Sequence, residues 1–246
     1  MLWENMERTR MMRLYHGSQI IVENPEYGKG KPHNDYGRGF YCTQNIELAK
    51  EWAAKSDEGT GFVNCYELNP AGLYILRLND GTHSSLEWLA LLAQFRTYWQ
   101  NHSIAEEAKE YLKEHFLPDI SYYDVIVGFR ADDSYFAIAQ DFIMGAINLE
   151  QLEKAFMLGN LGEQIVLKSP QSFRQIAFID ALPVDVPKYF THRVMRDRAA
   201  QREYRKIRQG AVTQGLLISD IIRKRMTKND PRLPKGLSIS RSEKSR

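Results

Sequence analysis

Short apolar runs alternate with helical patterns along the first 183 residues of the chain. The runs are rich in Val, Ile, Tyr and Phe and are bounded by glycine or polar residues, a pattern typical of short strands. They lie at 12–16, 39–43, 62–68, 73–78, 124–129, 164–167 and 175–179. Because Asn69-Pro70-Ala71-Gly72 separates the third run from the fourth, these two are predicted to form a hairpin.

The segments between the runs repeat apolar residues at helical spacing. Asn45 is a good N-cap for a helix through Lys55, with Ile46, Ala49 and Trp52 on one face. Further helices are predicted at 84–99, 104–116, 134–144 and 149–158. Short strands and helices without a regular strand–helix–strand rhythm argue against a doubly wound sheet. They favour an α+β fold with mostly antiparallel sheets and flanking helices.

The charge balance changes after Pro183 and Pro187. The whole chain of 246 residues has a net charge of +2. Residues 188–246 hold 17 Lys and Arg against 5 Asp and Glu, a balance of +12, which leaves −10 for residues 1–187. We therefore expect an α+β domain at 1–183 and a basic helical extension at 184–246, with a flexible tail rich in Ser, Lys and Arg.

Several classes of protein do not fit this composition. No apolar run approaches the roughly 20 residues of a membrane-spanning helix, and the start of the chain has no apolar signal segment. We therefore expect a cytoplasmic protein without a membrane partner. Cys42 and Cys65 have no metal-ligand spacing, so buried free thiols and no metal site are predicted.

Two short motifs carry the candidate chemistry. Tyr15-His16-Gly17-Ser18 ends one predicted strand, and Asp35-Tyr36-Gly37-Arg38-Gly39-Phe40-Tyr41-Cys42-Thr43 leads into the next. The His16 ring can bond a ribose hydroxyl while the backbone of Gly17 pairs with an amide, such as that of nicotinamide. Tyr41 can stack on a flat ring. The alternative is that both side chains only pack in the core.

Two other residues near these motifs are weaker candidates. Trp52, at the end of the predicted helix, could cover the opposite face of the ring that Tyr41 stacks on, although alone it reads as a core residue. Arg38 could reach phosphates. The loop around Arg38 lacks both the length and the following helix of a dinucleotide fingerprint, which excludes a Rossmann or P-loop site.

The order of these motifs resembles the H-Y-E branch of the ADP-ribosyltransferases, which includes the poly(ADP-ribose) polymerases and diphtheria toxin. Residues 14–179 are more similar to a family of bacterial domains assigned to this superfamily. Besides the two motifs, this similarity rests on Ala131-Asp132-Asp133 after a strand and on Gln164-Ile165-Val166-Leu167. The resemblance implies an ADP-ribosyltransferase-like split of the sheets and NAD as substrate. It assigns the ribose to His16, the carboxamide to Gly17 and the stacking to Tyr41, with Ser18, Gly39 and Thr43 as motif neighbours in the binding site.

The third catalytic position has two possible occupants, Glu163 and Gln164. Adjacent side chains on a strand face opposite ways, so only one of them can enter the site. A carboxylate would stabilise the positive charge that develops as nicotinamide leaves, whereas an amide would orient the ribose without a charge. The residues around 163–164 leave both registers open.

The resemblance implies an NAD-dependent mono-ADP-ribosyltransferase that modifies a protein or nucleic-acid acceptor, in the manner of a bacterial toxin or effector with a cognate antitoxin. A binding module for NAD or ADP-ribose with weak or no turnover is the alternative. The basic extension adds a third candidate, an NAD-dependent enzyme that acts on RNA.

Overall fold

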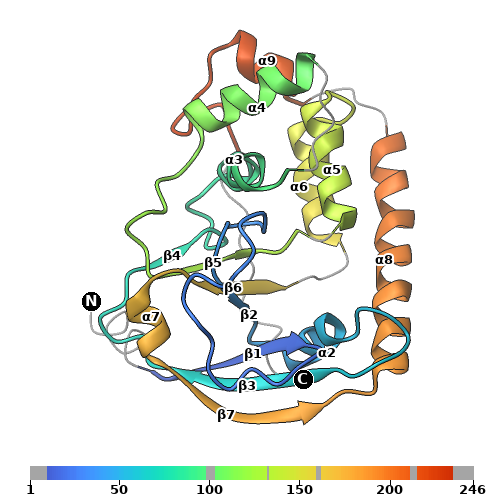
Figure 1. Ribbon diagram of the computed structural model, residues 1–246. Helices are drawn as coiled ribbons and strands as arrows, with labels where there is room; N and C mark the ends of the chain where they lie inside the picture. The colour runs from blue at the N-terminus through green and yellow to red at the C-terminus, as the bar shows by residue number, and fades with distance from the viewer. Residues whose placement is uncertain (1–9, 98–102, 132, 159–161, 211–214, 235–246) are drawn as a thin grey trace.

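A computed structural model describes residues 10–97, 103–131, 133–158, 162–210 and 215–234 (Figure 1). Its strands form two sheets. The first has the order β1 (Met12–Ser18), β3 (Phe62–Leu68), β7 (Ile176–Pro183) and is antiparallel throughout. The second has the order β2 (Phe40–Cys42), β6 (Glu163–Leu167), β5 (Val125–Phe129), β4 (Ile75–Arg77). Only the β4–β5 pair is parallel, so the mixed α+β class agrees with the prediction.

The predicted hairpin between residues 62–68 and 73–78 is wrong. Strand β3 pairs with β1 and β7 in the first sheet, while β4 pairs with β5 in the second. Both edges of β3 are therefore occupied by other strands, and β4 has no free edge of β3 to pair with. Leu73 and Ile75 pack into the apolar layer between the two sheets, which draws this segment away from β3.

Five helices begin close to the predicted positions, two lie in the predicted helical extension, and the short helix at 170–174 was not predicted. They are α2 (Ile46–Ala53), α3 (Ser85–Phe95), α4 (Ser103–His115), α5 (Asp133–Ile143), α6 (Leu149–Phe156), α7 (Pro170–Arg174), α8 (Val186–Gln209) and α9 (Ile218–Arg223). Asn45 caps α2 by accepting from the Glu47 and Leu48 amides, as predicted. Helix α3 ends earlier than predicted because Arg96 is extended.

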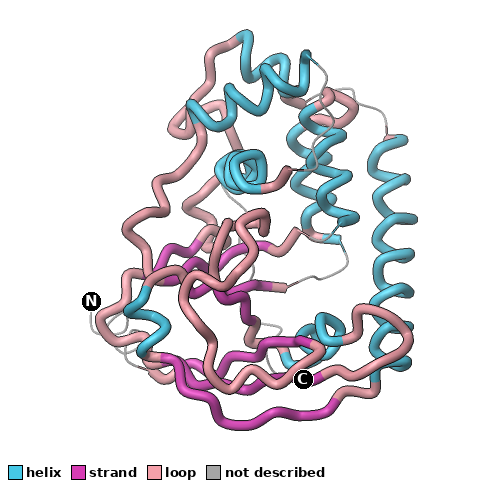
Figure 2. Tube along the Cα trace, in the orientation of Figure 1, coloured by secondary structure: helices cyan, strands magenta, loops and turns pink. Residues whose placement is uncertain are grey.

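The second sheet is covered on both faces. Val125, Val127, Ile165 and Leu167 face the first sheet, where they pack with Leu14 and Tyr66. Ile126 and Val166 face a helical layer that contains α3, α4, α5, α6 and α9 (Figure 2). Burial on both faces explains why β5 and the Ile165–Leu167 part of β6 are continuous apolar runs rather than alternating ones.

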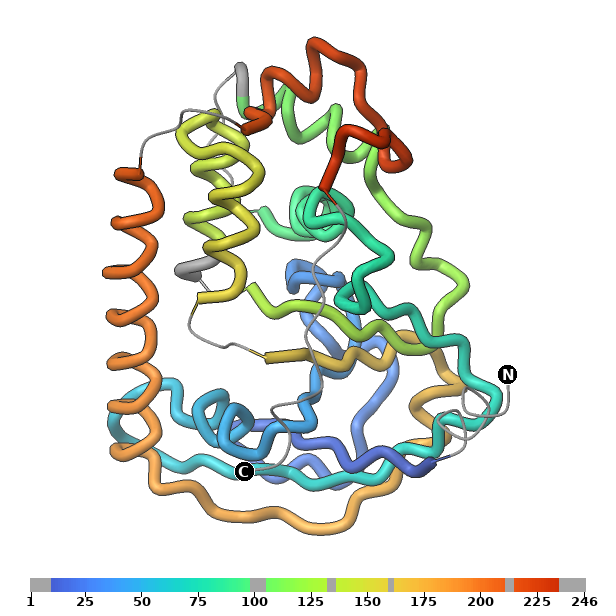
Figure 3. The backbone as a smooth tube through the Cα atoms, turned by 180° about the vertical axis from the view of Figure 1, so that it is seen from behind, coloured from blue at the N-terminus to red at the C-terminus, as the bar shows by residue number. Residues whose placement is uncertain are grey.

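The C-terminal part of the chain packs on the rest of the molecule. The predicted boundary at 183/184 coincides with the junction of β7 and α8. Helix α8 follows the side of the molecule and contacts α2 and α6 (Figure 3). Ile218, Ile221 and Met226 are fully buried within the helical layer, so the segment completes the core. The predicted tail from 235 lies outside the described residues. Within the described ranges, no helix has the length and apolar character needed to cross a membrane.

Candidate functional site

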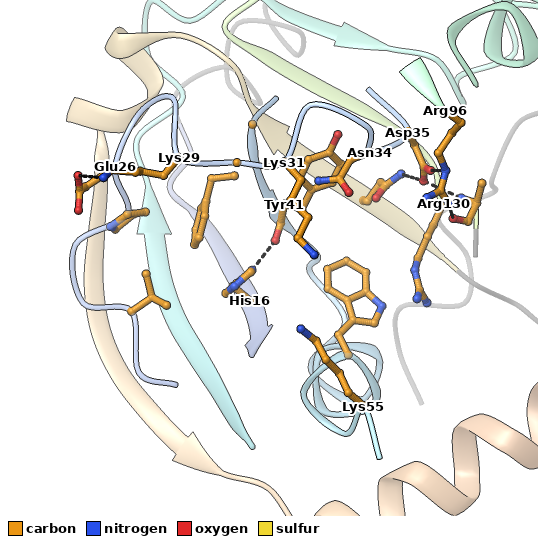
Figure 4. Close-up of a pocket in the computed structure, with 18 residues that line it drawn as sticks. His16, Glu26, Lys29, Lys31, Asn34, Asp35, Tyr41, Lys55, Arg96 and Arg130 are labelled. Atoms are coloured by element: carbon orange, nitrogen blue, oxygen red, sulfur yellow. Dashed lines mark hydrogen bonds and ion pairs between the residues drawn. The ribbon is translucent and has the colours of Figure 1, made fainter. Parts of the chain in front are cut away.

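A pocket of about 530 Å³ opens between β1, β2, the start of β6 and the loop that joins β1 to β2. This volume falls in the range of small-molecule sites. Figure 4 shows His16, Tyr41, Lys31 and Lys55 around the same opening, with Asp35, Arg96 and Arg130 at one side. The lining also includes Val22, Pro25, Glu26, Lys29, Gly30, Asn34, Gly39, Phe40, Trp52, Ala131 and Gln164.

Gly17 lets helix α2 lie directly on β1. A Cβ at this position would stand 1.9 Å from the Ala49 carbonyl oxygen and 2.8 Å from the Cβ of Trp52. No side chain can be accommodated at such distances, so the glycine is required by packing. The contact brings Trp52 to the pocket, where the Arg130 guanidinium lies 5.1 Å from the centre of its ring. One face of Trp52 is therefore covered by a cation.

His16 is held as a neutral ring of defined tautomer. Its Nδ1 lies 2.7 Å from the Tyr41 carbonyl oxygen, which can only accept, so Nδ1 carries the proton. Burial lowers the pKa of His16, and nearby Lys55 adds to this, although the bond to Tyr41 acts in the opposite direction. In the neutral ring, Nε2 is then a hydrogen-bond acceptor.

Tyr41 is fixed at both ends. Its backbone accepts from His16, and its hydroxyl donates to the Gly37 carbonyl at 2.7 Å and accepts from the Tyr36 amide at 3.1 Å. Burial raises the pKa of the phenol, so it stays protonated. Strand β2 pairs Tyr41 with Val166 of β6, and His16 and Tyr41 thus line one pocket from two different sheets.

Gln164 lines this pocket and Glu163 does not. Alternation along β6 puts Glu163 on the face that also carries Ile165, and its Oε1 accepts from Asn79 Nδ2 at 2.7 Å. Gln164 is 3% exposed and belongs to the opposite face. Of the two registers that the sequence leaves open, the structure has the one with the amide in the pocket.

A buried polar cluster stands behind Gln164. Its Nε2 donates to Asp35 Oδ2 at 2.7 Å and to the Phe129 carbonyl at 3.0 Å. Asp35 also accepts from the Ala131 amide at 2.9 Å and pairs with Arg96 at 3.1 Å. Burial raises the pKa of Asp35, whereas Arg96, Ala131 and Gln164 lower it.

Sequence reasoning gave Asp35 no role, although it is in the quoted motif. It also missed the basic lining, in which five basic side chains stand against two acidic ones: Lys29, Lys31, Lys55, Arg96 and Arg130 against Glu26 and Asp35. The available signal was that Lys29 and Lys31 precede the second motif and that Arg130 precedes Ala131; Arg96 lies far from every motif in the sequence. Asp132 lies outside the described residues, and nothing in the described side chains places Asp133.

Other predicted binding residues have structural partners away from the lining. Ser18 accepts from Asn64 Nδ2 and donates to the Ile20 carbonyl. The Thr43 hydroxyl accepts from the Asn45 amide, and its backbone pairs with Tyr15. Arg38 donates to the Gly28 and Gly30 carbonyls at 3.2 Å, which ties the rim of the pocket together. Gly39, by contrast, lines the pocket.

The two cysteines are buried free thiols, as predicted. Burial raises the pKa of each, so neither is a nucleophile at neutral pH. Among the described residues, no group of three or more His, Cys, Asp or Glu side chains is placed to hold a metal ion.

Comparison with curated proteins and with solved structures finds no match. A family model described as "Protein of unknown function (DUF3990)" matches residues 12–178. This range starts at β1 and ends within β7, and so contains the second sheet, the first sheet up to the start of β7, and the lining residues of the pocket. Because the match covers more than half of the sequence, the chain belongs to the DUF3990 family.

Proposed function

We propose that the protein is an NAD-dependent mono-ADP-ribosyltransferase. The observation that carries the proposal is the convergence of His16, Tyr41 and Gln164 on one basic pocket from strands of two sheets. His16 Nε2 would accept from a hydroxyl of the nicotinamide ribose. The Tyr41 ring would stack on nicotinamide, with Trp52 on the other side of the pocket.

Gly17 has its proposed role through the backbone. The Tyr15 amide and carbonyl both bond to Thr43, on the edge of β1 that faces away from β3. Alternation along a strand directs the peptide groups of Gly17 to this same edge. They would pair with the carboxamide of nicotinamide. The basic lining would favour the two phosphates of NAD.

The reaction breaks the bond between the ribose C1′ and the nicotinamide nitrogen. The bonding electron pair leaves with nicotinamide, and a nucleophile of the acceptor forms the new bond to C1′ and gives up its proton. Positive charge builds up on the ribose before the nucleophile arrives, so acceptor groups around it accelerate the step. The acceptor would be a protein or a nucleic acid, as for a cytoplasmic toxin or effector with an antitoxin.

A binding module for NAD or ADP-ribose is the second candidate. The observation in its favour is that an uncharged amide, Gln164, occupies the pocket while Glu163 faces away. An enzyme acting on RNA is the third. Arg198, Arg202 and Arg205 recur at helical spacing on the exposed side of α8, which would suit a phosphate backbone.

Incubation with NAD labelled in its adenylate part and with cell lysate tests the proposal. Wild type should transfer label to the protein or nucleic-acid fraction and release nicotinamide. His16→Ala, Tyr41→Ala and Gln164→Ala should each reduce both signals, while Glu163→Gln, the adjacent residue on the opposite face, should retain them. Binding of NAD without either signal would establish the module instead, and no binding at all would refute both.

A further inference from the structure

The orientation of the Gln164 amide is dictated by its surroundings. Asp35 Oδ2 and the Phe129 carbonyl oxygen are acceptors, and both lie within hydrogen-bond distance of Gln164 Nε2. An amide turned the other way would bring its oxygen against two oxygens in a buried site and would lose both hydrogen bonds. The nitrogen therefore points inward, and Oε1 is the atom of the amide that remains for a ligand.

Asp35 is itself held in place from three directions. Arg96 approaches Oδ1, while the Ala131 amide and Gln164 both donate to Oδ2. The residue is 5% exposed and comes from the loop between β1 and β2, whereas Gln164 is on β6. The carboxylate thus accepts two hydrogen bonds and pairs with a guanidinium, which fixes its position; burial raises the pKa of Asp35, while Arg96, Ala131 and Gln164 favour its charged form. Its charge also polarises the amide, because a donor bonded to a carboxylate makes the far oxygen of its own amide a stronger acceptor.

The Phe129 carbonyl, the second acceptor for Gln164 Nε2, is also held in place. It accepts from the Tyr36 hydroxyl at 2.7 Å and from Trp88 Nε1 at 3.2 Å, in addition to Gln164. A Cβ on Gly128 would lie 2.2 Å from the Tyr36 hydroxyl oxygen, so the glycine makes room for this arrangement. The whole cluster is preorganised around one side-chain amide.

We propose that Asp35 is a positioning residue that fixes and polarises Gln164, so that its Oε1 accepts a hydrogen bond from a hydroxyl of the nicotinamide ribose. The inference rests on the proposed function and deepens it. Gln164 would then provide the acceptor atom that a glutamate could provide. The negative charge would be on Asp35, which lies behind the Gln164 amide and further from the ribose. Asp35 does not touch the ligand in this arrangement.

A double-mutant cycle between Asp35→Asn and Gln164→Ala tests this mechanism through the steady-state kinetics of nicotinamide release. In Asp35→Asn, one orientation of the new amide brings its NH₂ group against Gln164 and the other brings it against Arg96, and both remove the negative charge that polarises the Gln164 amide. The turnover number should fall on the order of 10- to 100-fold, the usual effect of losing one hydrogen bond to a charged group. The KM for NAD should change less than about threefold, and in the Gln164→Ala background Asp35→Asn should have no further effect.

Asp124→Asn is the matched control. Asp124 is also buried, accepts from the Tyr74 amide and from Ser169, and lies outside the pocket lining. Its turnover number should equal that of the wild type. Three results would overturn the inference. Asp124→Asn could lose as much of its turnover number as Asp35→Asn, or Asp35→Asn could keep the turnover number of the wild type. Asp35→Asn could also cause the same loss in the wild type and in Gln164→Ala.

A measurement on the wild type covers the case in which Asp35→Asn does not fold. The Gln164 side-chain NH₂ protons, assigned by their absence in Gln164→Ala, should exchange slowly with solvent, and saturating NAD should leave them protected. Rapid exchange, or loss of protection on adding NAD, would show that the amide nitrogen does not stay on Asp35 and would contradict the inference.

Failure of the proposed function gives different results. If the wild type binds NAD without releasing nicotinamide, transfer is refuted. The double-mutant cycle is then measured through the dissociation constant for NAD. Non-additive effects of Asp35→Asn and Gln164→Ala support the inference, and additive effects overturn it. Analogues of NAD that each lack one hydroxyl of the nicotinamide ribose identify the hydroxyl that donates to Gln164 Oε1. With the analogue that lacks this hydroxyl, Asp35→Asn should have no effect on the dissociation constant. If the wild type does not bind NAD, both proposals fall.

Discussion

Replacing Gln164 by glutamate should destabilise the protein in a pH-dependent manner. The substitution keeps the shape of the side chain but brings a carboxylate oxygen to the place of Nε2, which lies 2.7 Å from Asp35 Oδ2. At an effective dielectric constant of about 20, two charges at this distance repel by roughly 6 kcal/mol. The new carboxyl group avoids most of this by taking up a proton, which then bonds Asp35.

The cost of that protonation sets the magnitude. An ordinary glutamate has a pKa of about 4.3, so holding it protonated costs about 3.7 kcal/mol at pH 7 and about 1 kcal/mol at pH 5. The folded-state pKa of the new residue is raised above the unfolded value, so the folded state binds more protons and stability falls as pH rises. Relative to the wild type, the variant should therefore lose about 3 kcal/mol more at pH 7 than at pH 5.

Denaturant unfolding of both proteins at the two pH values measures this difference. Glu163→Gln is the control, because Glu163 lies on the opposite face of β6, where its Oε1 accepts from Asn79 Nδ2. A Gln164→Glu variant with the same loss of stability at pH 5 and pH 7 would refute the reasoning, since it would show that the residue at 164 does not face a buried carboxylate.

Three further predictions concern residues around the motifs. Gly17→Ala should lower the free energy of unfolding by about 3 kcal/mol or more, because its Cβ would overlap the Ala49 carbonyl oxygen; thermal and denaturant unfolding measure this. Cys42 and Cys65 should react with a thiol reagent only as fast as the protein unfolds, since burial shields them and raises their pKa, and the rate should rise with denaturant. The ring of His16 should titrate below pH 6.5 when followed by NMR, and its contribution to stability should be lost as pH falls through that lowered pKa.

Each of these three has a contradicting outcome. A Gly17→Ala protein as stable as the wild type would mean that α2 does not pack on β1 as described. Fast modification of both thiols in the native protein would show that the layer around them opens readily. A His16 midpoint above pH 6.5 would show that the folded protein favours the charged ring, in conflict with its role as an acceptor through Nε2.

Local features of the fold were predictable because they depend on neighbouring residues. Short apolar runs located the strands, the helical spacing of apolar residues located most helices, and Asn45 marked the start of α2. The two glycine-containing motifs indicated a site on two strands, and His16, Gly39, Tyr41 and Trp52 do line one pocket. These predictions concern either a single segment or two motifs close in sequence.

Long-range pairing was not predictable in the same way. Leu73 and Ile75 look like the second half of a hairpin until the edges of β3 are occupied by β1 and β7, which come from distant parts of the chain. Residues 218–226 read as part of a basic appendage because their few apolar side chains are separated by charges. Only the packed helical layer shows that Ile218, Ile221 and Met226 fill the core.

The site shows the same division. The sequence by itself determined that a histidine, a tyrosine and either Glu163 or Gln164 were candidates, since these depend on residue type and spacing. Which of the two side chains enters the pocket was decided by the pairing of β6 between β2 and β5, because a shift of one residue would exchange the two faces. Asp35 meets Gln164 across 129 residues of sequence, and that contact exists only because two sheets and a loop close around the same buried space.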